Sequence, residues 1–463
     1  MSVLWTHMDA ARATGGKAVG NWSVNGLSID TRSLKEGQLF IPLKDIRDGH
    51  DFIPAALEKG AGAVISEHSI EDVPALIVED SLKALEDLAI AARKRSGATR
   101  IAITGSVGKT SVKEMVAQIC RAAGKTHNSI KSFNNHWGVP FTLAGMAQDT
   151  EYGVFEMGMN HAGELAALTK IVRPDIAVIT KVAPAHLAHF KSVEEIAKAK
   201  AEILSGLADG GVAILPKDSD YFDILRTYCK GNSQGDWLSF GWCAHADAVI
   251  TRSQQNPHGS ISSINIAGQT YNVELPIAGE HWVENAACAL LIAHTAGIDL
   301  KIAVNALKVM PKIQGRGAVY ELSLRGKSVT LVDESYNANP ESMAAAIAVL
   351  GLKTSRKIAV LGDMLELGDD ENALHEDIFG RLQDANVDLV LTCGSRMKSL
   401  HDVLPESVNA GWFSDYEKCL AGLLNQVQDG DWVMVKGSNA SGMGKLVAAL
   451  KLHQITKEYA HAL

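Results

Sequence analysis

The sequence predicts an α/β protein with three domains, on the basis of its length, its composition and its order of strands and helices. A chain of 463 residues corresponds to about three domains of roughly 150 residues each. Hydrophobic residues make up 46% of the chain and charged residues 21%, which is usual for a folded globular protein. From about residue 99 onward, short apolar runs alternate with helical patterns, and this alternation predicts largely parallel sheets.

Residues 1–82 are predicted to form a small α/β domain. The runs GQLFIPL (37–43) and GAVISE (62–67) have the composition of strands. The segment DFIPAALEKGA (51–61) is predicted to be a helix that ends at a glycine. A second helix, SLKALEDLAIAARKRSG (81–97), leads into the next domain.

Residues 83–312 are predicted to form a central domain around a mostly parallel sheet. Its strand-like runs are RIAIT, YGVFEM, DIAVIT and GVAILP, each separated from the next by a helical pattern. Near the end of this region, ISSINIAGQTYNVELPI (261–277) alternates with period two on both sides of Gly268, which predicts an antiparallel hairpin. A helix, HWVENAACALLIAHTAG (281–297), follows it.

Residues 313–463 are predicted to form a Rossmann-like, doubly wound domain. The segment PKIQGRG (311–317) contains a proline and two glycines between periodic segments, as domain boundaries often do. Beyond it the strands SVTLVD, KIAVLG, DLVLTCG and DWVMVKG are each followed by a polar loop and a helix. Ligands of such sheets bind at the carboxyl ends of the strands, so we expect these polar loops to face a ligand.

Charge and cysteine content narrow the class of protein. The formal net charge of −9 argues against broad binding to nucleic acid or to an anionic membrane surface. The six cysteines show no CxxC and no paired spacing, so we expect reduced thiols. We find no signal-peptide pattern and no apolar run near the ~20 residues of a membrane-spanning helix. These features predict a cytoplasmic protein without membrane insertion.

The segment IAITGSVGKTSVKE (101–114) predicts a phosphate-binding loop. A strand stops at Thr104, a glycine loop follows, and an apolar stripe at helical spacing then runs to Gly124. In this order the backbone N–H groups face phosphates, Lys109 reaches the β- and γ-phosphates, and the Thr110 hydroxyl meets Mg²⁺. The strict pattern places its first glycine where this chain has Ile103, so the loop departs from the usual form. The alternative is a plain strand-to-helix turn with a surface lysine.

Three further residues are candidates for the same site. Glu156 ends the strand YGVFEM, where a carboxylate can face a nucleotide-bound Mg²⁺ or can simply be an exposed charge. Lys200 lies on the apolar stripe of VEEIAKAKAEILSGL while Lys198 points away from it. A buried ammonium is unfavourable unless it is paired or modified, although a long side chain can also extend to solvent. His186 follows a strand and is either a ligand or a structural histidine.

A second glycine–lysine segment, GSNASGMGKL (437–446), does not meet the same criteria. Gly444 and Lys445 are not followed by serine or threonine, so no hydroxyl is available where the phosphate loop needs one. We expect this segment to be the beginning of a helix.

Taken together and in order, eight segments resemble the Mur ligases of bacterial peptidoglycan synthesis. The segments are TGSVGKTSVKE, SFNNHWGVP, FEMGMNHAGE, VAPAHL, AKAKAEI, DESYNANPESM, LGDMLELG and VKGS. The N-terminal SIDTRSLKEGQLFIPLKDIRDGHDFIPAAL is similar to the uridine-nucleotide domain of that family. The resemblance covers nearly the whole chain, and its specificity lies in the ordered set of motifs.

The resemblance implies an ATP-dependent, ADP-forming amide-bond ligase. The motifs are most similar to the branch of the family that joins D-alanyl-D-alanine to UDP-N-acetylmuramoyl-tripeptide. In that chemistry a substrate carboxylate attacks the γ-phosphate of ATP, and an amine then attacks the resulting acyl phosphate. Phosphoryl transfer of this kind needs a phosphate cradle, a lysine and Mg²⁺ rather than a protein nucleophile. We also expect a monomer, and from the net charge no binding of nucleic acid.

The resemblance assigns roles to residues at matching positions. ATP would be bound by the phosphate loop and by residues of the later segments: Gly105, Ser106, Val107, Gly108, Lys109, Thr110, Ser111, Asn285, Arg316, Asp333, Tyr336, Asn337 and Asn339. Thr110 and Glu156 would hold one Mg²⁺, and His186 and a carbamate on Lys200 would support a second, which makes Lys109, Lys200 and His186 the catalytic candidates. The UDP-substrate would contact Ser28, Asp30 and Arg32. Where the family usually has His-Asn, this chain has His281-Trp282, and a glycine frequent near Asp45 is missing.

Three alternatives differ from this hypothesis by a definable feature. A ligase that adds diaminopimelate as the third peptide residue typically carries Asp-Asn-Pro-Arg in its last domain, and this chain has no such motif. Folylpolyglutamate synthase shares the ATP core without the uridine-type domain. A phosphate-loop switch, from another class of protein, needs neither a substrate domain nor an incoming amine.

Overall fold

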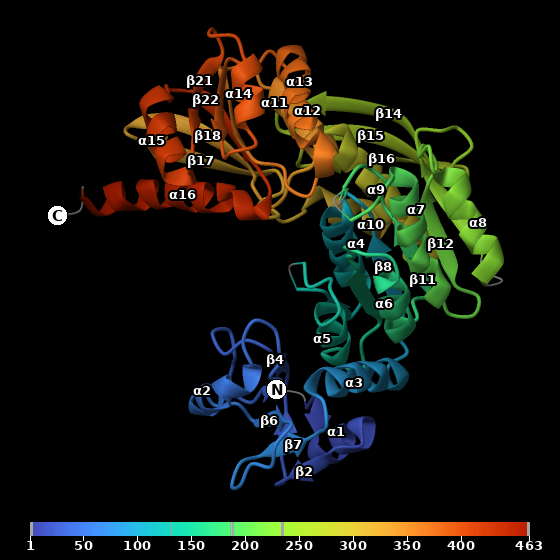
Figure 1. Ribbon diagram of the computed structural model, residues 1–463. Helices are drawn as coiled ribbons and strands as arrows, with labels where there is room; N and C mark the ends of the chain where they lie inside the picture. Colours follow the sequence, from blue (N-terminus) through green and yellow to red (C-terminus); the bar gives the residue numbers. More distant parts are fainter. Residues whose placement is uncertain (1–2, 131, 186, 188, 233–235, 461–463) are drawn as a thin grey trace.

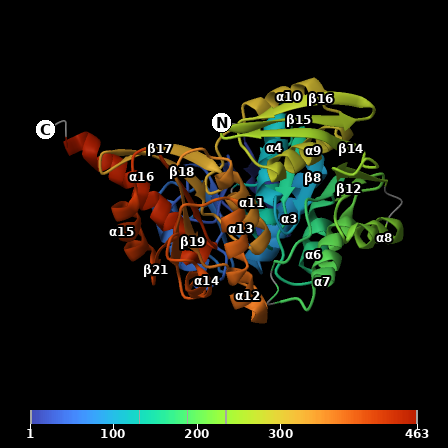
Figure 2. The same cartoon turned by 90° about the horizontal axis from the view of Figure 1, so that it is seen from above.

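The computed structural model describes residues 3–130, 132–185, 187, 189–232 and 236–460. Three α/β regions follow one another along the chain, each built on its own sheet, and a small pair, β1 (Trp5–Thr6) with β3 (Ser23–Val24), lies at the start. Figure 1 shows the first region below the central one and the third region beside its upper part, and Figure 2 shows the third region beside the central one from above. This architecture confirms the predicted α/β fold class. The exact domain limits given above remain a prediction.

The first region is a five-stranded sheet in the order β2-β7-β6-β5-β4. Its neighbours are parallel except for β2 and β7, which pair antiparallel. The predicted helix at 51–61 is a 3-10 turn followed by the short helix α2. The elements are α1 (His7–Thr14), β2 (Lys17–Val19), β4 (Leu27–Ser28), β5 (Leu39–Phe40), η1 (Gly49–Phe52), α2 (Ile53–Glu58), β6 (Ala63–Ser66) and β7 (Ala75–Ile77).

The central region contains a nine-stranded sheet in the order β16-β15-β14-β13-β12-β11-β8-β10-β9. The strands from β9 to β14 are parallel, and the predicted antiparallel hairpin is β15 with β16. The strands are β8 (Thr99–Thr104), β9 (Thr126–Asn128), β10 (Tyr152–Glu156), β11 (Ile176–Ile179), β12 (Val212–Pro216), β13 (Trp237–Gly241), β14 (Ala248–Asn256), β15 (Gly259–Ile266) and β16 (Gln269–Leu275). The sequence pattern had not predicted β9, β13 or β14.

Helices cover both faces of this sheet, as a parallel sheet requires. On β8, Ile101 and Ile103 pack into one core and Ala102 packs into another, so successive side chains point to opposite faces. The helices are α3 (Ser81–Arg95), α4 (Lys109–Ala123), α5 (Gly138–Ala144), α6 (Glu164–Val172), α7 (Val193–Ala201), η2 (Glu202–Gly206), α8 (Phe222–Asn232), α9 (Glu280–Thr295) and α10 (Leu300–Lys308).

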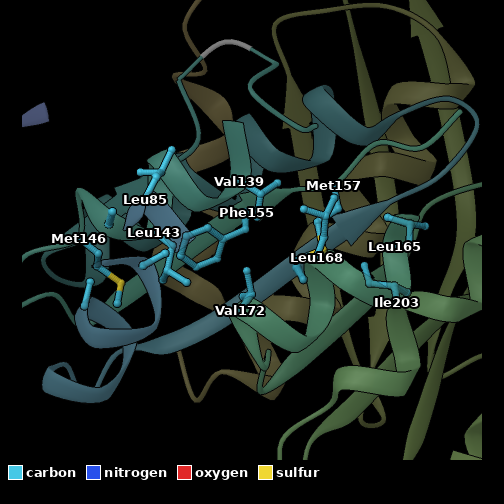
Figure 3. Packing of buried hydrophobic residues seen from close by; sticks show 14 of the residues in the cluster. Leu85, Val139, Leu143, Met146, Phe155, Met157, Leu165, Leu168, Val172 and Ile203 are labelled. Carbon is cyan, nitrogen blue, oxygen red and sulfur yellow. The ribbon is translucent and has the colours of Figure 1, made fainter. Parts of the chain in front are cut away.

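Helix α3 joins the first region to the central one. Its Leu85 belongs to the same buried cluster as Leu143 of α5 and Phe155 of β10, and Figure 3 shows these side chains close together. The cluster continues along α6 through Leu165, Leu168 and Val172. Helix α3 therefore fixes the first region on the helical layer that covers β10.

The third region is a six-stranded sheet in the order β17-β18-β22-β19-β20-β21. Its strands are parallel except for β17, which pairs antiparallel with β18. The elements are β17 (Ala318–Leu324), β18 (Lys327–Glu334), α11 (Pro340–Gly351), β19 (Lys357–Gly362), η3 (Gly368–Asp370), α12 (Glu371–Glu376), α13 (Ile378–Asp384), β20 (Leu389–Cys393), α14 (Lys398–Val403), β21 (Asn409–Phe413), α15 (Tyr416–Gln426), β22 (Asp431–Lys436), η4 (Asn439–Ser441) and α16 (Met443–Ala460). Among the described residues, no helix is both long enough and apolar enough to cross a bilayer.

Candidate active site

The loop between β8 and α4 depends on two glycines. Gly105 has φ +154°, and a Cβ there would lie 2.0 Å from the Thr180 Oγ1. Gly108 has φ +85°, and a Cβ there would lie 2.8 Å from the Asn285 Oδ1. L-residues rarely adopt such backbone angles, so each position favours glycine for conformation and for space. The contact also places Asn285, at the start of α9, directly against the loop.

The same loop is tied to the end of β11. The Ser106 backbone N–H donates to the Lys181 carbonyl at 2.7 Å, and its hydroxyl donates to the Ala183 carbonyl at 2.8 Å. The Thr180 hydroxyl donates to the Val107 carbonyl at 2.6 Å. These hydrogen bonds join the phosphate loop to the segment that follows β11 and hold the loop in one conformation.

Helix α4 begins with its first N–H groups available to an anion. Gly108 is its N-cap, and no side chain caps the helix. The N-terminal N–H groups of a helix carry partial positive charge and bind phosphates well. The Lys109 Nζ turns back to the Gly105 carbonyl at 2.6 Å. Burial lowers the pKa of Lys109, the Glu156 carboxylate opposes this, and the Arg316 charge adds to it. Ser111 is buried in the first turn of α4.

Next to the loop, polar side chains of helix α4, strand β10 and the segment between β9 and α5 lie together. The Thr110 Oγ1 donates to the Glu156 Oε2 at 2.8 Å, and both residues are buried. The other carboxylate oxygen, Oε1, accepts a hydrogen bond from the Asn134 Nδ2 at 2.8 Å. The Ser132 hydroxyl lies 3.3 Å from the Thr110 Oγ1. Sequence reasoning missed Asn134 and Ser132, although both lie in the SFNNHWGVP motif that follows β9.

Lys200 and Lys198 lie on opposite faces of α7. Lys198 is exposed and pairs with the Glu194 carboxylate at 2.7 Å, whereas Lys200 is only 2% exposed. Burial lowers the pKa of Lys200 well below its usual value, and the Lys109 charge lowers it further. The predicted placement of the two lysines on different faces of the helix is thus confirmed, and Lys200 lies within electrostatic range of the phosphate-loop lysine. His186, the other candidate from this segment, lies outside the described residues.

Arg316, from the third region, lines the same cavity as the phosphate loop. Its guanidinium lies 4.4 Å from the centre of the Tyr336 ring, and its Nε is buried without a hydrogen-bond partner among the residues that the structure describes. Asp333 is buried, and its carboxylate is already engaged with the protein, because it accepts hydrogen bonds from the Gly315 N–H and the Ser335 hydroxyl. Asp333 therefore orients the loop that carries Arg316.

Asn339 and Asn337, both predicted to contact the nucleotide, also make hydrogen bonds within the protein. The Asn339 side chain caps α11 by accepting from the Ser342 N–H at 2.8 Å. The Asn337 carbonyl accepts from the buried Lys436 Nζ at 2.9 Å, and Lys436 also lies 3.9 Å from the Glu334 carboxylate. Burial is the main cause that lowers the pKa of Lys436 and raises the pKa of Glu334.

One cavity between the central and third regions brings most of these groups together. It is lined by the phosphate loop, by Asn285, by Arg316 and by the segment that follows β18. Its lining also includes five titratable residues that sequence reasoning did not name: Lys181, Glu284, Glu334, Glu341 and Lys436. His281, noted above as the neighbour of Trp282, lines it as well. Burial, together with the charges of Lys436 and Lys181, lowers the pKa of His281 to about 4.

Comparison with protein families and curated proteins assigns the chain to one family. Residues 103–293 match the Mur ligase middle domain, and residues 316–439 match the Mur ligase glutamate ligase domain. The UDP-N-acetylmuramoyl-tripeptide–D-alanyl-D-alanine ligase of Rickettsia prowazekii is 32% identical over 96% of this chain and 99% of its own length. The chain belongs to the Mur ligase family. The ligase of the same name from Escherichia coli is 35% identical over 93% of this chain and 94% of its own.

Solved Mur ligase structures have the same fold over nearly the whole chain. MurF from Acinetobacter baumannii superposes with a TM-score of 0.84 at 30% identity and covers 96% of this chain and 98% of its own. MurF from Thermotoga maritima, solved in complex with ADP, gives a TM-score of 0.78 at 27% identity over 93% and 98% of the two chains. A folylpolyglutamate synthase from Mycobacterium tuberculosis shares the fold at 17% identity, with a TM-score of 0.63.

In this Mur ligase the uridine-type residues lie near a second cavity, between the first and central regions. The cavity measures about 700 Å³ and is lined by Asp30 and Arg32, among others. Arg32 pairs with Asp30 through its Nε and Nη2, the shortest distance being 2.7 Å. Ser28 does not line the cavity, because it is buried and its hydroxyl donates to the Asp30 carbonyl at 3.0 Å. Ser28 thus acts on this cavity through Asp30.

The unusual Trp282 of this Mur ligase is part of the core. It is 2% exposed and packs in the cluster that includes Val112 and Met115 of α4. The indole therefore supports the helix of the phosphate loop from behind. Trp282 and its neighbour His281 both contribute to the lining of the cavity between the central and third regions.

Proposed function

We propose that this chain joins D-alanyl-D-alanine to UDP-N-acetylmuramoyl-tripeptide with conversion of ATP to ADP and phosphate, a step of peptidoglycan synthesis. The observation that carries the proposal is the match, over more than nine-tenths of each chain, to relatives of that name. A match of this extent includes the first region with its cavity as well as the ATP core. The proposal therefore covers the UDP-substrate as well as the nucleotide.

The reaction has two steps with balanced bonds. An oxygen of the tripeptide carboxylate attacks the γ-phosphorus of ATP, the bond to the β-phosphate oxygen breaks, and ADP leaves. The amine of D-alanyl-D-alanine then attacks the acyl carbon, loses a proton, and expels inorganic phosphate as the amide forms. Activation replaces a poor leaving group by a good one and divides one difficult step into two easier ones.

The chain contributes positioning and charge to both steps. In this proposal the N–H groups at the start of α4 hold the β- and γ-phosphates, and Lys109 neutralises charge that develops on the transferred group. Arg316 would bind the γ-phosphate from the third region. Its buried Nε has no hydrogen-bond partner among the described residues, which supports this role. Tyr336, below the guanidinium, would restrict Arg316 to one orientation.

The residues beside the phosphate loop fit Mg²⁺. A hydroxyl and a carboxylate, Thr110 and Glu156, lie 2.8 Å apart at the start of α4, and Mg²⁺ prefers such oxygen ligands. No group of three or more His, Cys, Asp or Glu that could hold a metal ion occurs among the described residues, so water and phosphate oxygens would complete the shell. Bound there, the ion would neutralise phosphate charge and orient the triphosphate.

We also propose that Lys200 carries a carbamate. The modification forms from carbon dioxide and a neutral amine, and burial favours the neutral form of Lys200. A carbamate would replace a positive charge by a negative one beside Lys109, where it could support a second metal ion together with His186. An unmodified ammonium would compete with the metal.

The remaining expectations follow from the substrates. We propose that the protein works as a monomer in the cytoplasm, where ATP and nucleotide-linked substrates are available, and that it does not bind nucleic acid. The third-residue ligases remain the alternative within the family. A phosphate-loop switch remains the alternative outside it.

Phosphate release, measured with ATP, Mg²⁺ and UDP-N-acetylmuramoyl-tripeptide, tests the proposed function. Adding D-alanyl-D-alanine should start steady turnover and yield one amide product per phosphate. Turnover with UDP-N-acetylmuramoyl-dipeptide and diaminopimelate or lysine instead would favour the third-residue ligase. Phosphate release that does not depend on any added amine would favour a switch.

A further inference from the structure

The described residues of the segment 129–137, between β9 and α5, contact two separate sites. We name this segment the bridging loop. One side of it meets the oxygen cluster of Thr110 and Glu156. The other side forms part of the wall of the 700 Å³ cavity that also contains Asp30 and Arg32.

On the metal side, three hydrogen bonds join the bridging loop to Glu156 and to Gly158 just beyond it. The Asn134 Nδ2 donates to the Glu156 Oε1 at 2.8 Å. The Glu156 backbone N–H donates to the hydroxyl of the buried Ser129 at 3.1 Å. The Asn134 carbonyl accepts from the Gly158 N–H at 2.7 Å, just beyond the strand that carries Glu156. The side chain and backbone of Asn134 are therefore both fixed relative to the proposed metal ligand.

On the substrate side, Asn134 lines the cavity itself. Ser132, Phe133, Asn134, Asn135 and Trp137 all contribute to its wall, opposite Asp30, Arg32 and Arg47 of the first region. A ligand in this cavity therefore meets the residue that orients Glu156. The cations on the opposite wall suit an anionic ligand such as a nucleoside diphosphate derivative.

The start of the bridging loop is anchored to the phosphate-loop helix. Lys113 of α4 is fully buried, and its Nζ donates to the Ser129 carbonyl at 3.0 Å. This bond fixes the first residue of the loop to the helix that begins at Lys109.

We propose that Asn134 is a positioning residue that couples the metal–nucleotide site to the UDP-substrate cavity; this inference rests on the proposed function. The Glu156 Oε2 accepts a hydrogen bond from Thr110, and its Oε1 accepts one from Asn134. A metal ion held at Oε2 would therefore leave Oε1 available to fix the Asn134 side chain. A UDP-substrate packed against the bridging loop would fix the Asn134 side chain, and Asn134 would then orient the Glu156 carboxylate through their hydrogen bond. Coupling between binding sites is reciprocal, so each ligand should tighten the other by the same factor.

Calorimetric titration without turnover tests the coupling. UDP-N-acetylmuramoyl-tripeptide is titrated into the protein with and without Mg²⁺ and the non-hydrolysable analogue AMP-PNP, and AMP-PNP is titrated with and without Mg²⁺. The wild-type protein should bind the UDP-substrate at least ~5-fold more tightly when Mg²⁺ and AMP-PNP are present. In Asn134→Ala this ratio should fall to nearly one, and the gain in AMP-PNP affinity from Mg²⁺ should drop ~10–100-fold.

A control and a milder variant make the result decisive. His136→Ala alters an exposed ring on the same loop and should keep the wild-type ratio. Asn134→Ser, too short to reach Glu156, should behave like Asn134→Ala and gives the answer if the alanine variant does not fold. An unchanged ratio in both Asn134 variants would overturn the coupling and leave the proposed function intact. A wild-type protein that binds no UDP-substrate under any condition would overturn the proposed function and the coupling with it.

Discussion

Two segments of the chain combine a strand, glycines, a lysine and a helix, yet they have different surroundings. Between β8 and α4, the phosphate loop has Gly108 as N-cap, and Lys109 is partly buried and turned back over the loop. Between β22 and α16, the Ser441 hydroxyl donates to the Ser438 carbonyl at 2.6 Å, and the Ser438 hydroxyl donates to the Ala338 carbonyl at 3.2 Å. Lys445 is exposed and lies 5.7 Å from the Tyr416 ring.

The difference shows what a phosphate loop requires besides its glycines and lysine. In the first segment, the neighbouring side chains bind the outside of the loop and leave the helix N-terminus open. In the second, serine hydroxyls occupy carbonyls of the loop and of the preceding segment. The absence of serine or threonine after Lys445 was the sequence signal for this difference, and the hydrogen bonds of Ser438 and Ser441 are its structural counterpart.

The largest expected difference between the two segments concerns their lysines. Lys109→Ala should lower the ligation rate ~10²–10³-fold, because it removes charge stabilisation of the transferred phosphoryl group. Lys445→Ala changes an exposed side chain and should stay within about twofold of wild type. Steady-state phosphate release measures both. Equal losses in the two variants would contradict the assignment of the phosphate loop.

A second pair of lysines tests the buried group beside the phosphate loop. Lys200→Ala should lower the rate ~10–100-fold, because it removes a group that would support a metal ion. Small carboxylic acids should partly restore activity by occupying the vacated anion position. Lys198→Ala, which breaks only an exposed pair with Glu194, is the matched control and should be nearly neutral. A lower rate in Lys198→Ala with an unchanged rate in Lys200→Ala would contradict the role proposed for Lys200.

The glycines of the two segments should differ in their effect on stability. Gly105→Ala places a Cβ 2.0 Å from the Thr180 Oγ1 at an unfavourable φ, and should lower the free energy of unfolding by about 2–4 kcal/mol. Gly444→Ala meets nothing closer than 3.8 Å in the first turn of α16, and should raise it by up to about 1 kcal/mol. Urea denaturation of both variants measures the difference. A tolerated Gly105→Ala would show that the loop is looser than its hydrogen bonds suggest.

The smallest expected effect concerns the contact between the phosphate-loop side and the third region. Lys181, whose carbonyl binds Ser106, pairs with the Glu341 carboxylate of α11 at 2.5 Å. Both side chains are about two-fifths exposed, so Glu341→Gln should change the free energy of unfolding by less than ~1 kcal/mol. Thermal unfolding and the KM for ATP measure it. A large rise in KM would mean that this pair sets the position of the third region for catalysis.

The sequence was sufficient for most of the architecture because the strands are buried and apolar. Runs such as RIAIT and KIAVLG could be placed from composition alone, and the hairpin around Gly268 from its period-two alternation. Strands β9, β13 and β14 were missed. The short β9 and the partly exposed β13 lack a continuous apolar run, and β14 alternates with mostly polar residues.

In the site, sequence reasoning found residues that belong to a recognisable motif or interrupt an apolar pattern. It missed residues whose importance comes only from where the fold places them. The pattern of α7 placed Lys200 on the apolar stripe of the helix, and left burial or extension to solvent as the two alternatives for its side chain. Asn134 and Lys436 gave no such signal, because an asparagine in a polar loop or a lysine at a strand end is unremarkable until the fold places it against Glu156 or in the cavity. The roles of the predicted site residues remain to be tested by mutation.

The most direct test of the central claim follows the oxygen of the substrate carboxylate. UDP-N-acetylmuramoyl-tripeptide labelled with ¹⁸O in that carboxylate is turned over with ATP and D-alanyl-D-alanine, and the released phosphate is analysed by mass spectrometry. Attack of the carboxylate on ATP transfers a carboxylate oxygen to phosphorus, so each phosphate released should carry one ¹⁸O. Unlabelled phosphate would mean that water attacks the nucleotide, and would contradict the assignment of this chain as an acyl-phosphate ligase.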